Sequence, residues 1–323
     1  MNEGKIVKII HLDYPFDASH LPEDVVLALG FFDGFHQGHR QIVKMAAEIA
    51  NDHNLPLMVM TFNRHPKEVY AADQHFPYID ELSEKAAKMA AFGVDYLAVV
   101  NFTKTFSQLS AQAFVDGVIC QLHASTVVAG FDYTYGAEKT ADMAHLASYA
   151  QGRFDIICVR KQTLNGKKIS STAIRQAIQA GNIAQAAEWL GSHYELSGQV
   201  VHGKRNGHKL GFPTANLDWS AKKVLPKVGV YATKVLVAGQ WYDAMTSVGY
   251  NVTIGANTKI LIESNLFDFH QDIYGQIITI KWYQYLRPEL KFAGLPALKT
   301  QLTADERMVR AYFRELAAKA SKA

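Results

Sequence analysis

The spacing of apolar runs changes near Leu190, and this change constrains the fold more than any other feature of the chain. Before that point, short apolar runs such as 25–30, 57–62 and 96–101 alternate with segments of helical periodicity. Strands alternating with helices are typical of a parallel sheet with both faces covered. The first half therefore predicts an α/β domain. Further strands are expected over 125–130 and 154–159, and helices over 37–50, 80–92, 110–122 and 143–150.

After Leu190 the chain contains many short strand-like segments, turn residues between them, and few long helices. This pattern favours an antiparallel barrel or sandwich. The tail over 296–318 returns to helical composition, and 170–191 reads as a helix-rich connection with a break at Gly181. We place the boundary near residue 186, giving domains 1–186 and 187–323. The predicted strands of the second domain are 197–202, 229–237, 241–248, 259–266 and 275–283.

Composition excludes several classes of protein. With 323 residues, 49% hydrophobic and 20% charged, the chain can form two ordinary cores. The numbers of basic residues (33) and acidic residues (30) nearly balance. The chain has no long Lys/Arg run of the kind that would suggest nucleic-acid binding. Neither a membrane helix nor a secretory leader is recognisable, so we expect a cytoplasmic protein. Two distant cysteines exclude a disulfide framework, and we expect Cys120 and Cys158 to fill strand or helix interiors.

The first chemical constellation is Gly30–Arg40 (G-F-F-D-G-F-H-Q-G-H-R), which joins a predicted strand to a predicted helix. At such a junction, helix N-termini direct backbone N–H groups at phosphates. His36 and His39 can face one side of the first helical turn and stabilise charge on the α-phosphorus of a triphosphate. The alternative is a pair of surface, core or metal-ligand histidines. Glycines that let the backbone approach a phosphate, or take positive φ, are Gly30, Gly34 and Gly38.

A second run, Ile169–Arg175 (I-S-S-T-A-I-R), follows the last predicted strand of the first half. Hydroxyl groups ahead of a helix N-terminus form a phosphate-binding turn, and Arg175 can pair with phosphate oxygens in a fork. The alternative is a plain N-cap followed by a helix. The expected phosphate-binding hydroxyls belong to Ser170, Ser171 and Thr172.

Together the two runs resemble the H-x-G-H and I-S-S-T-x-x-R motifs of the H-x-G-H nucleotidyltransferase superfamily. The resemblance implies a Rossmann-like sheet, ATP phosphates bound by both motifs, and in-line attack by a phosphate without a protein nucleophile. T-F-N-R-H-P (61–66) and G-F-D-Y-T-Y-G (130–136) resemble segments of bacterial FAD synthetases. The pattern alone leaves Asp132 as an ordinary turn residue. The resemblance implies that the residues around ATP and the flavin are Asp33, Asn63, His65 and Asp132.

The second constellation is Gly207–Leu217 (G-H-K-L-G-F-P-T-A-N-L). Gly207 and Gly211 offer backbone donors for phosphate, and an extended segment would place Thr214 and Asn216 on one face. Their oxygens suit Mg²⁺, although a strand edge facing water explains the pattern as well. Glu263 lies in an apolar predicted strand, where an unused carboxylate is costly, so it is either a general base or a solvated residue.

These segments resemble the riboflavin kinase family. G-F-P-T-A-N (211–216), L-P-K-V-G-V-Y-A (225–232), E-S-N-L-F-D-F (263–269), D-I-Y-G (272–275) and L-R-P-E-L-K-F (286–292) occur in family order. The resemblance implies a small β-barrel with a terminal helix, in which Thr214 and Asn216 bind Mg²⁺–ATP and Glu263 activates the ribityl 5′-hydroxyl. It also implies that Arg287 lies near the flavin.

The whole chain thus resembles bifunctional bacterial riboflavin kinase/FAD synthetases, which implies two reactions: riboflavin to FMN, then FMN to FAD, with ATP and Mg²⁺ in both. Phe35, Asn63–Arg64 and Asn265 depart from the usual family residues. Two alternatives remain, namely a single retained activity and a flavin-binding regulator. Expected partners are riboflavin, FMN, FAD and ATP, without nucleic acid or membrane, for a monomer or weak homo-oligomer.

Overall fold

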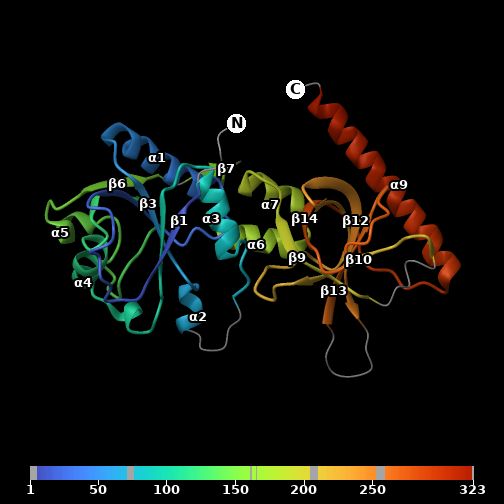
Figure 1. Ribbon diagram of the computed structural model, residues 1–323, viewed down its shortest axis with the longest axis horizontal. Helices are drawn as coiled ribbons and strands as arrows, with labels where there is room; N and C mark the ends of the chain where they lie inside the picture. The colour runs from blue at the N-terminus through green and yellow to red at the C-terminus, as the bar shows by residue number, and fades with distance from the viewer. Residues whose placement is uncertain are drawn as a thin grey trace. The chain divides into compact units, whose positions relative to one another are not determined.

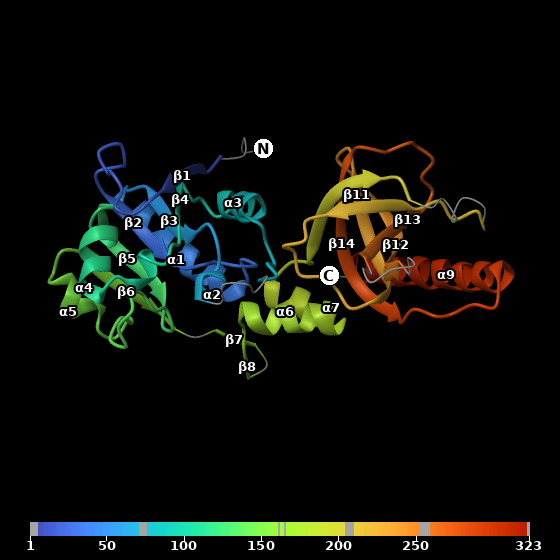
Figure 2. The ribbon, with the colours of Figure 1, turned by 90° about the horizontal axis from the view of Figure 1, so that it is seen from below.

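The computed structural model describes residues 6–70, 76–160, 162–164, 166–203, 210–251 and 259–321. The chain divides into two compact units, Met1–Ser171 and Thr172–Ala323 (Figures 1 and 2). The division into compact units falls between Ser171 and Thr172. The boundary near residue 186, which separates the two predicted domains, stays a prediction. The two units are described separately below.

The first unit contains a six-stranded parallel sheet with the strand order β1-β4-β3-β2-β5-β6. The central strand β2 is buried along its whole length, and its alternate side chains enter two different cores. This burial on both faces explains why the strand reads as a continuous apolar run. The strands are β1 (Lys8–Leu12), β2 (Val25–Leu29), β3 (Leu57–Phe62), β4 (Tyr96–Val100), β5 (Ala124–Gly130) and β6 (Asp155–Val159).

Helices cover both faces of this sheet, as the alternating pattern predicts. One core contains buried residues of α1 and α3, and the other contains residues of α4 and α5. The helix predicted over 110–122 begins as α4 and continues as a π-helical turn at Val115–Ile119. The helices are α1 (Gln37–His53), α2 (Pro66–Tyr70), α3 (Leu82–Ala90), α4 (Ala111–Phe114) and α5 (Leu146–Ala150), with a 3₁₀ turn at Phe106–Gln108.

Several elements of the first unit were not predicted from the sequence. Strand β1 lies at the sheet edge, and its mostly exposed residues give no apolar run. The short hairpin of β7 (Thr163–Leu164) and β8 (Lys167–Lys168) likewise carries no apolar signal. The expectation that both cysteines are interior was wrong: Cys158 is exposed on the edge strand β6, and Cys120 is only partly buried.

Helix α6 (Ser171–Ala180) enters the second unit at Thr172, and α7 (Ile183–Leu190) follows it after Gly181, which has φ 82°. A closed antiparallel barrel follows, with the strand order β10-β13-β12-β11-β14-β9. Closure decides between the barrel and the sandwich, and confirms the predicted fold class. The strands are β9 (Glu195–Val201), β10 (Ala215–Trp219), β11 (Gly229–Val237), β12 (Gln240–Asn251), β13 (Lys259–Leu266) and β14 (Ile277–Arg287).

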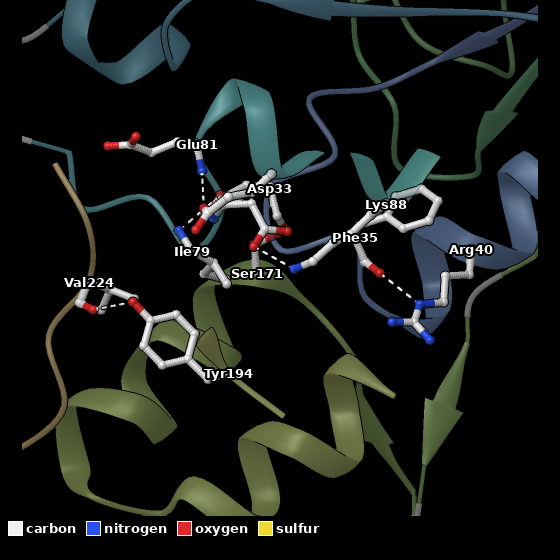
Figure 3. A network of polar contacts seen from close by, with 11 residues as sticks. Asp33, Phe35, Arg40, Ile79, Glu81, Lys88, Ser171, Tyr194 and Val224 are labelled. Atoms are coloured by element: carbon white, nitrogen blue, oxygen red, sulfur yellow. Dashed lines mark hydrogen bonds and ion pairs between the residues drawn. The ribbon is translucent and has the colours of Figure 1, made fainter. Parts of the chain in front are cut away.

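The C-terminal helix α9 (Leu295–Ala320) packs on the barrel. Val309 and Phe313 of this helix form one core with Ala232 and Met245 of the barrel wall. Within the barrel region, the Tyr194 hydroxyl donates a 2.6 Å hydrogen bond to the Val224 carbonyl, drawn in Figure 3. The predicted helical tail is therefore confirmed as a terminal helix that completes the core of the second unit.

Candidate functional site

The loop after β2 has an unusual backbone, because three of its residues adopt left-handed conformations. Phe32, Gly34 and Phe35 have φ values of 56°, 80° and 34°. Such values are strained for bulky residues and persist where the surroundings fix them. Both phenylalanine rings are fully buried, and Phe35 packs edge-on against Phe92 with ring centroids 5.0 Å apart. Phe35, which differs from the usual family residue at this position, is therefore accommodated by packing against Phe92.

The three glycines of this loop have distinct structural roles. Gly34 takes the positive φ that the sequence allowed. A Cβ on Gly30 would lie 2.8 Å from the Phe32 ring, and one on Gly38 would lie 3.2 Å from Cε1 of His36. Gly30 and Gly38 therefore make room for aromatic rings of their own loop. Phosphate binding by these glycines stays a prediction.

His36 and His39 lie together at the start of α1, as their spacing predicts. Their rings stack with centroids 3.6 Å apart and an interplanar angle of 15°. His36 is the N-cap of the helix, and its Nδ1 accepts a 3.2 Å hydrogen bond from the backbone N–H of His39. Because Nδ1 accepts this bond, the proton of a neutral His36 resides on Nε2. The loop thus presents an Nε2–H donor.

Burial keeps both imidazoles neutral near pH 7. Desolvation is the main cause that lowers the pKa of His36 to about 4, and the charges of Lys168 and Arg40 lower it further. The pKa of His39 also lies well below its ordinary value, again mainly through desolvation. The pair is therefore suited to donating hydrogen bonds to phosphate oxygens, and does not carry a permanent positive charge.

This burial predicts that the first unit loses stability in mild acid. The unfolded chain binds a proton at His36 near pH 6.5, whereas the folded chain binds it only near pH 4. The stabilising contribution is therefore complete above pH 6.5 and is lost as pH falls toward 4, amounting to about 3 kcal/mol. Urea denaturation followed by far-UV circular dichroism measures it. His36→Asn, which retains a capping side chain, should flatten this dependence; an equally steep dependence would contradict it.

Asp33 holds the loop in place from within the protein. Its carboxylate accepts hydrogen bonds from the backbone N–H groups of Ile79 (3.0 Å) and Asp80 (3.1 Å), and the side chain is 1% exposed. Its backbone carbonyl accepts a 2.8 Å bond from the Ser171 hydroxyl (Figure 3). These contacts give Asp33 a structural role in the loop. Its predicted role in ATP binding remains untested.

The I-S-S-T-A-I-R run is placed as predicted at the beginning of a helix. Ser171 and Thr172 open α6, and Arg175 follows one turn later with a buried side chain. Ser170, immediately before the helix, is partly buried, and Thr172 is exposed. The Ser171–Asp33 bond joins this motif to the histidine loop within the first unit, an association that the sequence resemblance implied.

The predicted flavin-side residues of the first unit lie in the segments that follow β3 and β5. The Asn63 amide donates to Asn101 (2.8 Å) and accepts from the Phe102 backbone (3.0 Å). The His65 ring stacks on Phe76 with centroids 3.8 Å apart. Asp132 forms an ion pair with Lys168, a residue that no sequence motif singled out. Because the charges of Asp132 and Lys168 both affect the His36 pKa, this ion pair belongs to the histidine environment.

In the second unit, the structure brings together two residues that the sequence keeps far apart. Asn216 of β10 pairs directly with Glu263 of β13 in the antiparallel register. Directly opposed residues have their Cβ atoms about 4.5–5.5 Å apart, so the amide and the carboxylate are neighbours. A Cβ on Gly203 would lie 2.3 Å from the Asn216 amide, so Gly203 is required beside it. Sequence patterns did not indicate Gly203.

Thr214 lines a cleft of about 430 Å³ in the second unit. The loop after β13, from Phe269 to Tyr274, also lines this cleft. The buried Asn265 donates a 2.6 Å hydrogen bond to the Pro213 carbonyl, so this departure from the family pattern fixes the segment that carries Thr214. Gly211 has φ 85° with open space around it. Gly207 lies outside the described residues.

Arg287 forms an ion pair with a residue of the C-terminal helix. Its guanidinium binds the Asp305 carboxylate through Nε (2.9 Å) and Nη2 (2.6 Å), and Nη1 donates to the Pro288 carbonyl. Asp305 is completely buried and also accepts from Gln301. These contacts tie β14 to α9. Flavin contact by Arg287 stays a prediction.

The ion pair predicts a large stability loss when Asp305 is replaced. Asp305→Ala removes the carboxylate partner of Arg287, whose side chain is only 14% exposed, and should destabilise the second unit by about 3–5 kcal/mol. Asp268→Asn is the matched control, because Asp268 pairs with Arg310 but its side chain is 80% exposed, so its loss should cost far less. Tryptophan fluorescence measures both, since all four tryptophans follow residue 171. Equal midpoints for the two variants would contradict this interpretation.

Comparison with known proteins identifies the class of this protein as a transferase. Family models of FAD synthetase and of riboflavin kinase match residues 18–173 and 190–313. Proteins described as bifunctional riboflavin kinase/FMN adenylyltransferase are 45% identical in Listeria monocytogenes (96% of this chain, 99% of the relative) and 38% identical in Bacillus subtilis (96% and 99%). The chain belongs to the bifunctional riboflavin kinase/FMN adenylyltransferase family, with its FAD synthetase domain N-terminal and its riboflavin kinase domain C-terminal.

A solved structure from Streptococcus pneumoniae, described as a macrolide-efflux protein, shares this fold. It is 37% identical, with a TM-score of 0.86 over 93% of this chain and 99% of its own. Among the described residues of the present chain, no helix is long and apolar enough to span a membrane. The efflux description belongs to the Streptococcus protein.

Proposed function

We propose that the histidine pair of the first unit catalyses adenylyl transfer from ATP to FMN, and that the Asn216–Glu263 pair of the second unit catalyses phosphorylation of riboflavin. The observation that carries the first assignment is the stacked, neutral His36/His39 pair at the carboxyl end of β2. For the second assignment it is the direct cross-strand pairing of an amide with a carboxylate.

In adenylyl transfer, an FMN phosphate oxygen attacks the α-phosphorus of ATP as the bond to the pyrophosphate leaving group breaks. His36 donates its Nε2–H to a phosphate oxygen and stabilises the charge that develops there. His39 supports the same group from the stacked position. Ser170, Ser171, Thr172 and Arg175 hold the polyphosphate, and the flavin lies against Asn63, His65 and Asp132. The products are FAD and pyrophosphate.

In riboflavin phosphorylation, Glu263 accepts the proton of the ribityl 5′-hydroxyl, whose oxygen attacks the γ-phosphorus of ATP, and ADP leaves. Thr214 and Asn216 offer the neutral oxygen ligands that Mg²⁺ accepts, and the glycine at position 203 leaves room beside the Asn216 amide. When bound, Mg²⁺ would neutralise charge on the transferring phosphate. Gly207 and Gly211 would supply backbone donors, and Arg287 would lie at the flavin end.

We further propose that the protein acts as a monomer or weak homo-oligomer in the cytoplasm, where ATP is available, and that it binds no nucleic acid. The near balance of basic and acidic residues, with no long cationic run, supports the last point. The boundary near residue 186 is proposed to separate the two activities.

A time course of riboflavin, ATP and Mg²⁺ with the purified protein tests this function. Chromatographic separation of flavins should show FMN appearing first and FAD forming from it, with chelation of Mg²⁺ stopping both steps. Accumulation of FMN without FAD, even when FMN is supplied, would leave the kinase as the only activity. Tight flavin binding without turnover of either flavin would instead favour a flavin-binding regulator.

A further inference from the structure

A lysine lies buried directly beneath the histidine loop. Lys85 of α3 is 3% exposed, and its Nζ donates to the Phe31 carbonyl (2.6 Å) and to the Thr61 hydroxyl (3.2 Å). Phe31 lies in the loop after β2, and Thr61 lies near the end of β3. The ammonium also lies 4.3 Å from the centroid of the Phe31 ring. One cation thus joins two neighbouring strand ends at the base of the site.

Titratable groups on three different segments interact electrostatically with the Lys85 ammonium. Asp33, in the loop after β2, and Asp80, before α3, both favour the charged ammonium. Desolvation acts in the opposite direction and lowers the Lys85 pKa to about 8, so the ammonium remains charged at pH 7. On α1, the same positive charge contributes to the lowered pKa of His39.

Stability alone does not account for a cation at this position. Removing an ammonium group from water costs several kcal/mol, and well-packed apolar residues often replace buried ions without loss of stability. The two hydrogen bonds of Lys85 compensate part of that cost. The remaining effect of the charge is exerted on the loop carbonyl and on His39, which are elements of the proposed adenylyl-transfer site.

We propose that Lys85 is a positioning residue for adenylyl transfer, whose buried ammonium holds the Phe31 carbonyl and contributes to the electrostatic field at His39. This inference rests on the proposed function of the histidine pair. Lys85 itself touches no substrate in this account. With the cation removed, Asp33 loses a nearby positive charge, whereas Asp80 keeps its ion pair with Lys88. His39 also becomes easier to protonate. The loop also loses its link to β3.

Two variants separate the charge from the hydrogen bonds. Lys85→Met removes both, whereas Lys85→Gln removes the charge and keeps an N–H donor. Lys88→Gln is the matched control, because Lys88 lies on the same helix and binds Asp80, but its side chain is 29% exposed. The C-terminal kinase provides an internal check in each preparation, since riboflavin phosphorylation does not involve α3.

The experiment combines NMR titration of the His39 imidazole with the rate of FAD formation from FMN. We expect the His39 pKa to be higher in both Lys85 variants than in the wild type and to stay unchanged in Lys88→Gln. The kcat of FAD formation should fall about tenfold or more in Lys85→Met and less in Lys85→Gln, with riboflavin phosphorylation retained.

An unchanged His39 titration in both Lys85 variants would overturn the inference. Loss of both enzyme activities in both variants would also overturn it, because Lys85 would then serve only the fold. His36→Ala, assayed in parallel, separates this result from a failure of the proposed function. If His36→Ala makes FAD at the full rate, both the proposed role of the histidine pair in adenylyl transfer and the inference about Lys85 are wrong. If His36→Ala is inactive and the Lys85 variants resemble the wild type, only the inference falls.

Discussion

Replacing His36 with alanine should slow FAD formation from FMN by about 10²- to 10³-fold, the usual cost of removing one donor that stabilises transition-state charge. The variant loses the Nε2–H that the N-cap hydrogen bond defines. Riboflavin phosphorylation should continue, so FMN accumulates. Chromatography of a riboflavin, ATP and Mg²⁺ reaction measures both steps at once.

The N-cap role of His36 requires its own control. Loss of a cap costs about 0.5–2 kcal/mol of helix stability, which by itself could disturb the loop. His36→Asn retains a capping oxygen but offers no imidazole N–H, so it should be as inactive in FAD formation as His36→Ala while melting close to the wild type. Substantial FAD formation by His36→Asn would show that capping, and not the imidazole, is what the reaction needs.

Replacing Glu263 with glutamine should slow FMN formation from riboflavin by about 10²- to 10⁴-fold, the range attributed to a positioned general base. Glutamine has nearly the same shape, so the pairing with Asn216 across β10 and β13 should persist. The amide cannot accept the hydroxyl proton in the way that a carboxylate does. The rate of FMN formation at saturating riboflavin and ATP measures the loss.

FAD formation from supplied FMN serves as the internal check on Glu263→Gln and should stay at the wild-type rate. Thr214→Ala is a useful companion variant, because loss of a proposed metal ligand should be partly relieved by higher Mg²⁺, whereas loss of a base should not. A wild-type rate of FMN formation by Glu263→Gln would eliminate the carboxylate as the base and leave it as a solvated strand residue.

The fold was largely predictable because burial leaves a clear periodicity. Strand β2 is apolar throughout since its alternate residues enter two cores, and the barrel strand β11 matches its predicted range in both bounds. Strands β1 and β10 were missed. The first is exposed along most of its length, and the second follows a turn-rich segment that reads as a loop.

The site was predictable where it is local in sequence. The spacing of His36 and His39 sufficed to bring their rings together on one helical turn. The neighbouring positions of Asn216 and Glu263 depend on barrel register, which no local pattern encodes. The buried Lys85 was missed for a related reason: a lysine in an amphipathic helix reads as a solvated residue until tertiary contacts enclose it.

Closure of the barrel has a consequence for how sequences of this kind can diverge. In a ring of strands, a slip at one junction must be cancelled elsewhere, so the alignment of Asn216 with Glu263 is held by all six strands and not by β10 and β13 alone. A single-residue insertion inside any strand would turn its outward side chains inward. Length variation is therefore expected in the connections between strands, while the strands themselves keep their length.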